Sequence, residues 1–427
     1  MPGVRAEPVA VTGVGVKTPA GLTPDELWAA LCAGRSSAQV YHDDRLPSDA
    51  RLLVCRVGAF DARAYLSPVE LRRLDRAHQL AIGAAQDAID DGPAARPPPD
   101  RCAVVCGVGL GAPAFQEEQY GRLIGAGALG ISPLAIPMMM PSALAALLSL
   151  RFGFTGPCMT VSAACASGAT AVAEGVELIR RGAADLVLAG GADAMVTYSA
   201  LAGFLRLDVM SRRSDTPERA ALPFDAERDG FVMGEGAGFV VLQRVADAAA
   251  ARRLHGFVLG HASTADAHSL VAPSPRGEGA LACMRRALAD AAVATDALSH
   301  VNAHGTATRQ GDLAEALALQ ALFGGLGVPV TAIKGSTGHL VAGSGAVEAI
   351  VALRCLREGL VPPVAGLQTV DFAIDLDLVR GVPRMIGRGP ALSNSFGFGG
   401  MNTVQDAWAL VTMSEISPLR ETTPAKV

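Results

Sequence analysis

The chain has 427 residues, of which 50% are hydrophobic, 4% aromatic and 18% charged, and its net charge is −5. This length suits two domains or one large duplicated core, and the scarcity of aromatic residues indicates a core of Ala, Val, Leu and Gly. The weak acidity and the absence of a basic run exclude a nucleic-acid partner. The high apolar content excludes intrinsic disorder.

Strand-like and helical patterns alternate through the first part of the chain. Residues 9–15 form a short apolar segment that predicts a strand, and residues 24–32 predict a helix. A longer amphipathic pattern predicts a single helix over residues 71–90, and residues 102–107 predict another strand. Short apolar strands separated by helices are typical of an α/β protein with buried sheets.

Residues 123–150 contain no charged side chain and are long enough to cross a membrane. Three prolines interrupt the stretch and would break a continuous helix, so we predict a buried segment and no membrane partner. Its centre includes Met138 and Met140, whose flexible side chains suit an acyl pocket or a subunit interface. Ordinary core packing accounts for them equally well.

Eight cysteines are scattered along the chain, without a C-x-x-C pair or a Cys/His cluster at metal-ligand spacing. We expect reduced, mostly buried thiols, as in a cytosolic protein. The first residues lack the layout of a signal peptide, and a cytoplasmic location is the expectation.

Two segments of the chain resemble each other. Residues 162–182 and 336–359 each begin with a turn of Gly, Ala and Ser and continue as a helix of small residues that ends in Arg and Gly. This repeat predicts two related halves that meet near residue 253, with one domain over 1–253 and the other over 254–427. The first turn contains Cys165 and the second contains His339.

Cys165 lies among small residues and directly before a helical pattern. A ligand could therefore approach the sulfur, and a helix N-terminus would stabilise a thiolate and offer amide groups to an oxyanion. A buried, inert cysteine is the better explanation when this segment is considered alone.

Three further segments place polar residues at turns. A predicted strand end runs into a turn with His304, and Asp312 and Glu315 follow, for which helix capping is the ordinary role. Lys334 precedes His339 and is one of only three lysines, the other 33 of the 36 basic residues being arginines. Residues 394–402 form a glycine-rich loop with two phenylalanines.

These segments carry four motifs: AACASG at 163–168, FDAERDGFVMGEGAG at 224–238, NAHGTAT at 302–308, and K-x-x-x-G-H at 334–339. His339 follows His304 by 35 residues. In the order and spacing of these motifs the chain resembles the β-ketoacyl-acyl-carrier-protein synthases of the Cys-His-His type, most like the elongating synthase II enzymes. The resemblance extends over nearly the whole chain.

The resemblance implies the thiolase fold, a five-layered α-β-α-β-α core of two similar halves that pairs into dimers. It implies that Cys165 takes an acyl group from a carrier protein, with the amides of Cys165 and Phe398 as the oxyanion hole. His304 and His339 would hydrogen-bond the malonyl thioester during decarboxylation. The product would be a β-ketoacyl thioester two carbons longer.

The resemblance also implies supporting roles. Lys334 and Glu315 would form an ion pair that orients the histidines, and Asp312 and Asn402 would support the surrounding loops. Phe398 would gate the pocket. The residues implied to contact the substrate are Thr306, Thr308, Phe396 and Phe398, and we add Gln116, Met138 and Met140 as pocket candidates.

No metal or dissociable cofactor is implied, because the phosphopantetheine arm of an acyl carrier protein carries the substrates. Arg72 and Arg73 fall where the family docks its carrier protein, although a solvated helix face explains them at least as well. The dimer partner would be a second copy or a related chain-length-factor-like chain.

Two departures from the family pattern stand out. The usual G-H-L-L-G-A-A-G is here GHLVAGSG at 338–345, which exchanges a glycine and an alanine and could reshape the acyl tunnel. Gln116 stands where long-chain synthases place an apolar pocket residue. A polar amide beside alkane loses hydrogen bonds, so we expect a short, unsaturated or polyketide-like acyl chain.

Other readings of the sequence fit less well. An initiating synthase pairs Cys with His and Asn, whereas this chain has a second imidazole. A chain-length-factor-like subunit lacks the nucleophile that Cys165 supplies, and a Cys-His hydrolase leaves the lysine and second histidine unexplained. The motifs suit type II fatty-acid synthesis and type II polyketide or polyene assembly, with AACASG closer to fatty-acid synthase II.

Overall fold

The computed structural model describes residues 7–46, 51–248, 251–325 and 327–406. The larger of its sheets has eight strands in the order β2-β3-β7-β6-β4-β5, with β1 paired to β7 and β8 paired to β1. Its strands are β1 (Val9–Lys17), β2 (Gln39–Tyr41), β3 (Leu52–Cys55), β4 (Cys102–Gly107), β5 (Cys158–Val161), β6 (Leu186–Ala194), β7 (Met233–Arg244) and β8 (Gly256–Val258). β5 lies at one edge of this sheet and pairs in parallel with β4.

The second sheet has five strands in the order β11-β10-β14-β15-β9. β10 is parallel to both β11 and β14, while β15 runs antiparallel between β14 and β9. The strands are β9 (Gly260–Ala265), β10 (His300–Asn302), β11 (Val330–Thr331), β14 (Ala391–Gly397) and β15 (Met401–Asp406), and β12 (Leu360–Val361) and β13 (Arg384–Met385) form a separate pair.

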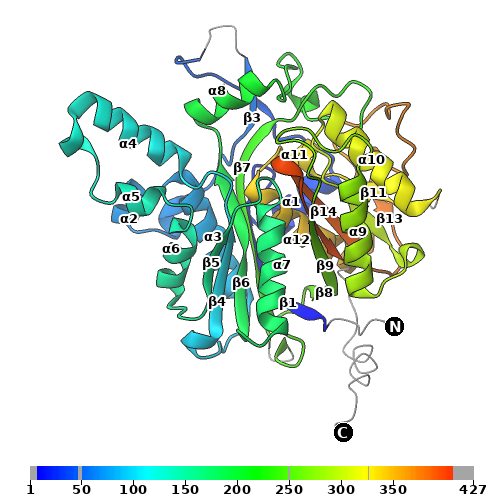
Figure 1. The fold of residues 1–427 in the computed structure, drawn as a ribbon, viewed down its shortest axis with the longest axis horizontal. Helices are drawn as coiled ribbons and strands as arrows, with labels where there is room; N and C mark the ends of the chain where they lie inside the picture. Colours follow the sequence, from blue (N-terminus) through cyan, green and yellow to red (C-terminus); the bar gives the residue numbers. More distant parts are fainter. Residues whose placement is uncertain (1–6, 47–50, 249–250, 326, 407–427) are drawn as a thin grey trace.

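Helices cover both sheets and fill the space between them (Figure 1). α7 (Ser167–Arg180) and α12 (Ala342–Glu358) lie between the sheets. α3 (Arg76–Asp91) and α6 (Ala143–Phe152) cover the outer face of the first sheet, and α9 (Glu278–Ala291) and α10 (Arg309–Phe323) that of the second. The result is five layers, α-β-α-β-α, which confirms the predicted fold class.

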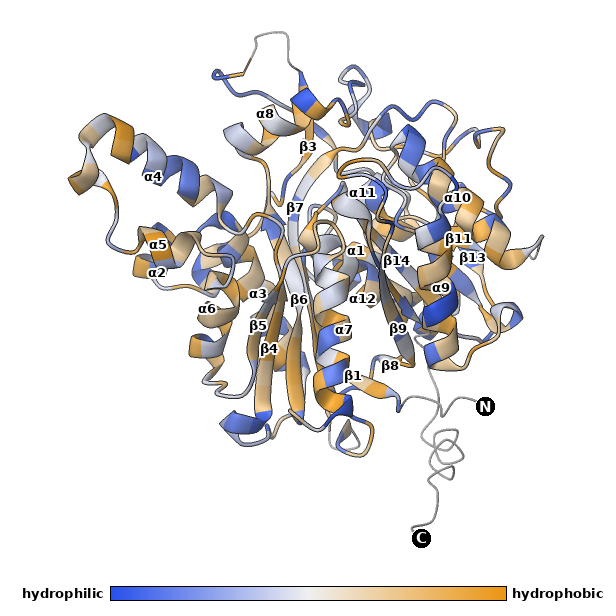
Figure 2. Cartoon of the chain, viewed as in Figure 1, coloured by the Kyte–Doolittle hydropathy of each residue, from blue (hydrophilic) through white to orange (hydrophobic). Residues whose placement is uncertain are grey.

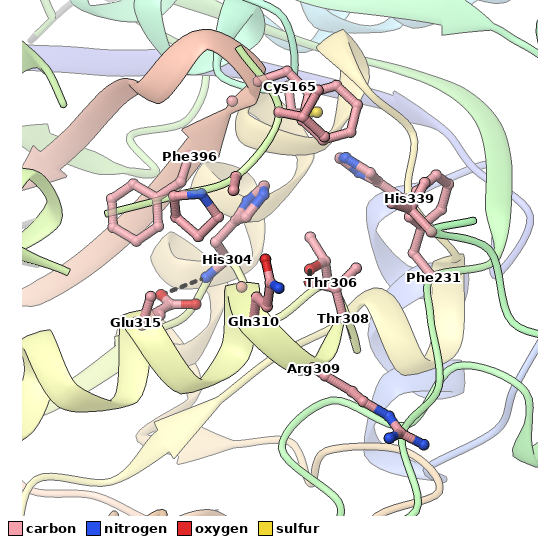
Figure 3. A pocket seen from close by; sticks show the side chains of 18 of the residues that line it. Cys165, Phe231, His304, Thr306, Thr308, Arg309, Gln310, Glu315, His339 and Phe396 are labelled. Atoms are coloured by element: carbon pink, nitrogen blue, oxygen red, sulfur yellow. Dashed lines mark hydrogen bonds between the residues drawn. The ribbon is translucent and has the colours of Figure 1, made fainter. Parts of the chain in front are cut away.

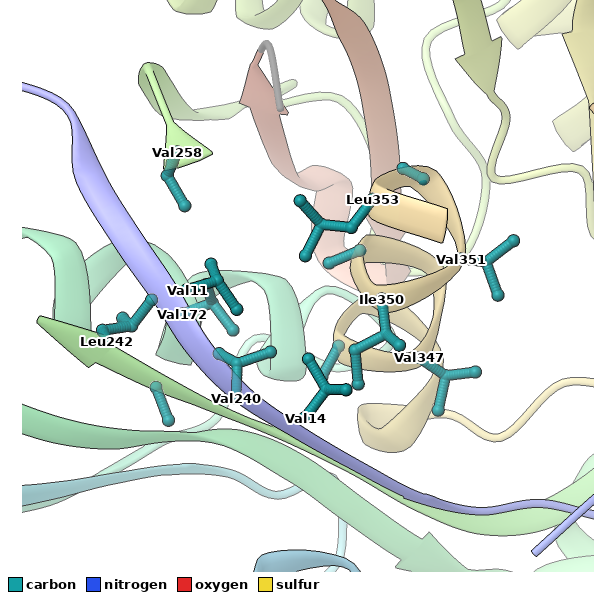
Figure 4. Packing of buried hydrophobic residues seen from close by; sticks show 14 of the residues in the cluster. Val11, Val14, Val172, Val240, Leu242, Val258, Val347, Ile350, Val351 and Leu353 are labelled. Atoms are coloured by element: carbon teal, nitrogen blue, oxygen red, sulfur yellow. The ribbon is translucent and has the colours of Figure 1, made fainter. Parts of the chain in front are cut away.

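The central layer packs through apolar side chains of both halves. Val11 of β1, Val240 and Leu242 of β7, and Val347 and Ile350 of α12 belong to one buried cluster, and Figure 4 shows the two strands passing beside α12. β8 lies after residue 253 in the chain yet pairs with β1, so the second half contributes one strand to the first sheet.

The backbones of α7 and α12 are in direct contact, because each helix has a glycine on the side that faces the other helix. A Cβ atom added to Gly168 would overlap the carbonyl oxygen of Ala342, and one added to Gly345 would lie 2.8 Å from the nitrogen of Ala169. A close approach of this kind needs residues without side chains. The two turns that were predicted from the internal repeat therefore meet across the centre of the molecule.

Most predicted elements are confirmed, and one is wrong. α1 (Pro24–Cys32) has the predicted bounds, whereas the single helix expected over 71–90 is two helices, α2 (Pro68–Arg73) and α3. Leu74 is extended, and the Asp75 carboxylate accepts a hydrogen bond from Ala77 N, which caps the start of α3. The amphipathic pattern runs on through this break because both helices pack on the same core.

The prediction that residues 123–150 are buried is wrong for much of the segment. α4 (Pro113–Ala126) and α5 (Ala135–Met139) project from the body of the molecule, and we call residues 113–140 the arm (Figure 1). Figure 2 shows hydrophobic residues on it. Leu129 is 100% exposed, Ile124 86% and Ile136 70%.

The remaining helices are α8 (Tyr198–Leu207) and the short α11 (Lys334–Thr337). Within the ranges that the structure describes, none of the helices combines the length and the apolar character that crossing a membrane would need.

Candidate active site

Cys165 lies in a tight turn between β5 and α7. Ala164 has φ +48, a conformation that is costly for a residue with a side chain. Ser167 holds the turn, because its hydroxyl accepts from Ala163 N at 2.8 Å and donates to Ala164 O at 2.6 Å. The strained turn points the thiol into a cavity (Figure 3).

The cavity has a volume of about 470 Å³ and lies between the two halves. Cys165 enters it from the first half, and His304 and His339 enter it from the second (Figure 3). Of the residues predicted to act in catalysis or to contact substrate, it is lined by Cys165, His304, Thr306, Thr308, Glu315, His339, Phe396, Phe398 and Asn402.

The two imidazoles meet at the base of the cavity. Their ring centroids are 5.5 Å apart and the ring planes are nearly perpendicular, at 85°. His304 follows the end of β10, and its backbone N–H and that of Gly305 donate to the two carboxylate oxygens of Glu315, each at 2.8 Å. The backbone of His339 is held in place because its N–H donates to Val232 O at 2.8 Å.

Lys334 pairs with Glu348 and not with Glu315, so the predicted Lys334–Glu315 ion pair is wrong. The Lys334 ammonium donates to a carboxylate oxygen of Glu348 on α12 and to His304 O, and it lies 3.2 Å from His304 Nδ1. Glu315 is already occupied by the two backbone N–H groups and by Asn394 Nδ2 at 3.0 Å. Its carboxylate therefore holds the His304 turn itself.

Glu348 is the functional candidate that the sequence reasoning missed. It is the one acidic residue in the apolar, small-residue run 342–353, which the structure buries between the sheets. A lone carboxylate in such a run needs a cationic partner. The isolated Glu348 was therefore a signal in the sequence, but the sequence did not identify Lys334 as its partner.

Both histidines are held neutral. Burial, and then the positive charge of Lys334, lower the pKa values of His304 and His339 well below 6.5. Lys334 has only protons to donate, so it leaves His304 Nδ1 as the acceptor and places the ring proton on Nε2. The neutral ring can then donate from Nε2.

Cys165 is partly buried at the cavity wall, and its thiol is not a stabilised thiolate. Burial raises its pKa to about 11, although the charge of Lys334 and the backbone N–H of Phe398 act in the opposite direction. The backbone N–H groups that favour the thiolate are present, but burial of the sulfur has the larger effect on its pKa. The predicted contribution of the helix N-terminus stays a prediction, and α7 begins only at Ser167.

The prediction of a loop over residues 394–402 is wrong for most of its length, because β14 and β15 form a hairpin there with only residues 398–400 between them. This hairpin turn lies directly against the nucleophile turn. A Cβ atom on Gly397 would lie 2.7 Å from Ala163 O and 3.2 Å from Cys165 N. This contact brings the N–H groups of Phe398 and Cys165 to the sulfur, as an oxyanion hole requires. Asn402, in β15, donates from Nδ2 to Asp266 Oδ1 at 2.6 Å and so links this segment to the residue that follows β9.

Asp312 holds two backbone segments beside the cavity. Its carboxylate accepts from Phe224 N at 2.7 Å and from Ala307 N at 3.0 Å, and both residues have positive φ, +64 and +67. Burial raises the pKa of Asp312 to about 7. Thr306 and Thr308 flank Ala307, and their hydroxyls are 2.9 Å apart at the cavity wall.

Five predicted residues lie away from this cavity. Gln116 is on the arm, where its amide donates to Met139 O at 3.4 Å, and Met138 and Met140 follow on the same arm. Arg72 and Arg73 are exposed on α2. The cavity wall contains instead Phe204 and Phe231, whose rings are 5.6 Å apart and which had not been singled out.

Comparison with known proteins identifies the family. Residues 6–248 match the Beta-ketoacyl synthase, N-terminal domain, and residues 255–368 match the Beta-ketoacyl synthase, C-terminal domain. The chain is similar to a curated protein of Synechocystis sp., 3-oxoacyl-[acyl-carrier-protein] synthase 2, at 36% identity over 411 residues that cover 94% of this chain and 98% of that protein.

Two solved structures have the same architecture over 95% of this chain and 100% of theirs. One is a type II PKS acyl-carrier protein in complex with its ketosynthase bound to the hexaketide, with a TM-score of 0.87 and 27% identity. The other is the ishigamide ketosynthase/chain length factor, with a TM-score of 0.86 and 29% identity. Both domains, the full-length relative and the cavity built on Cys165, His304 and His339 lead to one conclusion: the chain belongs to the β-ketoacyl synthase family.

Proposed function

We propose that the protein catalyses a decarboxylative condensation in which Cys165 holds the growing acyl chain. The sulfur attacks the carbonyl carbon of an acyl thioester, and the carrier thiol leaves with the proton of the cysteine. The N–H groups of Cys165 and Phe398 stabilise the oxyanion of this step. Because the pKa of the thiol is raised to about 11, proton loss must accompany the attack.

His304 and His339 act on the second substrate, a malonyl thioester. Their neutral rings donate to the thioester oxygen while the carbon–carbon bond to the carboxylate breaks and carbon dioxide leaves. The resulting carbanion attacks the acyl carbon on Cys165, the sulfur departs, and the β-ketoacyl thioester is two carbons longer. The protein is thus a condensing enzyme of the acyltransferase class.

The observation that carries this proposal is one cavity lined by a partly buried thiol and two neutral imidazoles. Lys334 and Asp312 hold the surrounding groups from outside the cavity, and Glu315, which touches the cavity wall, holds the His304 turn. Thr306, Thr308, Phe396 and Phe398 line the wall along which a phosphopantetheine arm would enter.

Intact-mass measurement tests the roles. We expect an acyl adduct on the wild-type protein and none on Cys165→Ala, which should still release carbon dioxide from a malonyl carrier protein. Cys158→Ala, which removes an exposed cysteine, is the matched control and should remain acylated. Condensation by Cys165→Ala at the wild-type rate would refute the proposal.

The partner is an acyl carrier protein, for which Arg72 and Arg73 on exposed α2 offer positive charge. One of the similar structures holds a ketosynthase with its acyl-carrier protein, which supports this choice.

The pathway is type II fatty-acid or polyketide synthesis. A cytoplasmic location and a boundary near residue 253 also stay predictions, and the lack of a disulfide among the cysteines of the described residues suits the former.

We further propose that the protein forms a dimer through the arm. β5 is an edge strand of the first sheet, and exposed apolar side chains gather on the nearby arm. Such surfaces mark protein interfaces. The other chain is a second copy or a chain-length-factor-like relative, and a similar solved structure is described as a ketosynthase/chain length factor.

A further inference from the structure

We propose that Ser344 is a positioning residue that keeps His339 Nδ1 as a hydrogen-bond acceptor and so directs the Nε2–H of this ring into the cavity. The inference rests on the proposed function, because it explains how His339 becomes a donor to the malonyl thioester. Ser344 lies in the first turn of α12, where the family pattern G-H-L-L-G-A-A-G has alanine. The hydroxyl is therefore a departure from that pattern.

The contacts of Ser344 determine where its proton points. Its Oγ accepts a hydrogen bond from Leu340 N at 3.0 Å and lies 3.2 Å from His339 Nδ1. A hydroxyl has one proton and two lone pairs. Since Leu340 N occupies a lone pair, and since the described residues offer the Ser344 proton no other acceptor, the proton is donated to His339 Nδ1.

A neutral imidazole carries a single N–H, so a ring that accepts at Nδ1 is protonated at Nε2. His339 is neutral because of its burial and the nearby charge of Lys334, which lower its pKa. Among the described residues no backbone N–H donates to His339 Nδ1, and the neighbouring Ala342 N–H donates to Asp193 Oδ2 at 2.9 Å. Lys334 donates to His304 Nδ1 as Ser344 donates to His339 Nδ1. Both rings therefore present Nε2–H to the cavity.

The chain contains a matched pair with the opposite arrangement. Ser299 Oγ lies 3.2 Å from His300 Nδ1, the same distance as in the Ser344 pair. However, the Ser299 hydroxyl donates to Pro390 O at 2.9 Å and must accept from His300. His300 is therefore protonated at Nδ1, and its buried Nε2 has no partner among the described residues.

Nitrogen NMR of the full-length protein with ¹⁵N-labelled histidine tests the proposal. We expect an Nε2-protonated signal for His339 and an Nδ1-protonated signal for His300, with His339→Gln and His300→Gln used to assign them. Ser344→Ala should shift His339 toward a mixture of tautomers. It should also lower kcat for malonyl carrier protein decarboxylation about fivefold, with KM changed less than about twofold.

Two further variants separate positioning from a structural effect. Ser344→Thr keeps the hydroxyl and should restore the tautomer and most of kcat. Ser299→Ala should change the His300 signal and leave decarboxylation unaltered. An Nδ1-protonated His339 in the wild type, or an unchanged tautomer and rate in Ser344→Ala, would overturn the inference. Full decarboxylation by His339→Gln would instead refute the proposed role of His339. The tautomer of His339 would still be read from the spectrum of the wild-type protein.

Discussion

Lys334 and Glu348 form an ion pair in the centre of the molecule, with 2% and 1% of their side chains exposed. The pair connects the His304 imidazole to α12, because the same ammonium also contacts His304 Nδ1 and His304 O. Two buried charges of opposite sign are stable together, and each alone is costly. The position of His304 therefore depends on a carboxylate that lies outside the cavity.

Glu348→Gln is expected to lower the free energy of unfolding by about 3–5 kcal/mol, because it leaves the Lys334 charge buried without a counter-charge. Decarboxylation should fall with it, since the uncompensated Lys334 either loses its proton or turns away from His304. Denaturant unfolding and carbon dioxide release measure the two effects. Glu358→Gln, at the exposed end of the same helix, should cost less than about 1 kcal/mol. Equal losses in the two variants would contradict the assignment.

The raised pKa of Cys165 predicts how its alkylation depends on pH. Only the thiolate reacts, and with a pKa of about 11 the thiolate fraction grows about tenfold for each pH unit between 7 and 10. Iodoacetamide labelling of Cys165, followed by peptide mass spectrometry, should rise by that factor without a plateau. Lys334→Met removes a charge that lowers this pKa and should slow labelling at every pH. A plateau below pH 9 would contradict the prediction.

Gly168→Ala is expected to destabilise the protein by about 1–3 kcal/mol, since the new Cβ atom overlaps the backbone of Ala342 and forces α7 away from α12. Acylation of Cys165 should fall as well, because the nucleophile turn moves with α7. Thermal unfolding and intact-mass acylation check both statements. Gly203→Ala in α8 is the control: its Cβ meets nothing within 4 Å, and Ala suits a helix better than Gly. If both variants behave alike, the close approach of the helices is not required.

Ile136→Asp on the arm should convert the proposed dimer to a monomer. Ile136 is 70% exposed in the single chain, and a carboxylate buried at an interface is strongly unfavourable. Sedimentation velocity at micromolar concentration measures the change. Val382→Asp introduces the same charge at an exposed apolar position outside the arm and should leave the dimer intact. A wild-type protein that sediments as a monomer would refute the homodimer and leave the related chain as partner.

Gln116→Leu tests the expectation that residue 116 contacts the acyl chain, since the structure places Gln116 on the arm and outside the lining of the cavity. The wild type should transfer short, unsaturated or polyketide-like acyl groups to Cys165 faster than long saturated ones, because an amide beside alkane loses hydrogen bonds. The leucine variant should accept long saturated chains at least several-fold faster. Gln86→Leu on α3 should leave the preference unchanged. A clear wild-type preference for long saturated chains would reject the hypothesis.

Local patterns in the sequence were sufficient for features that neighbouring residues decide. α1 has its predicted bounds because Thr23 caps it, accepting from Glu26 N, and Pro24 begins it. The repeated small-residue turns and the motif spacings likewise located Cys165, His304 and His339, the residues that line the cavity. Local pattern did not predict the break between α2 and α3, because the Asp75 cap lies inside one continuous amphipathic pattern.

The sequence by itself determined which residue types stand at the site, the α/β class and the two similar halves. Only the tertiary structure decided that Lys334 pairs with Glu348, that burial of the Cys165 sulfur raises its pKa, and that much of the uncharged segment belongs to an exposed arm. The reason is physical. Ion pairing, desolvation and exposure depend on which distant segments surround a group, and those segments meet only when the two sheets close around α7 and α12.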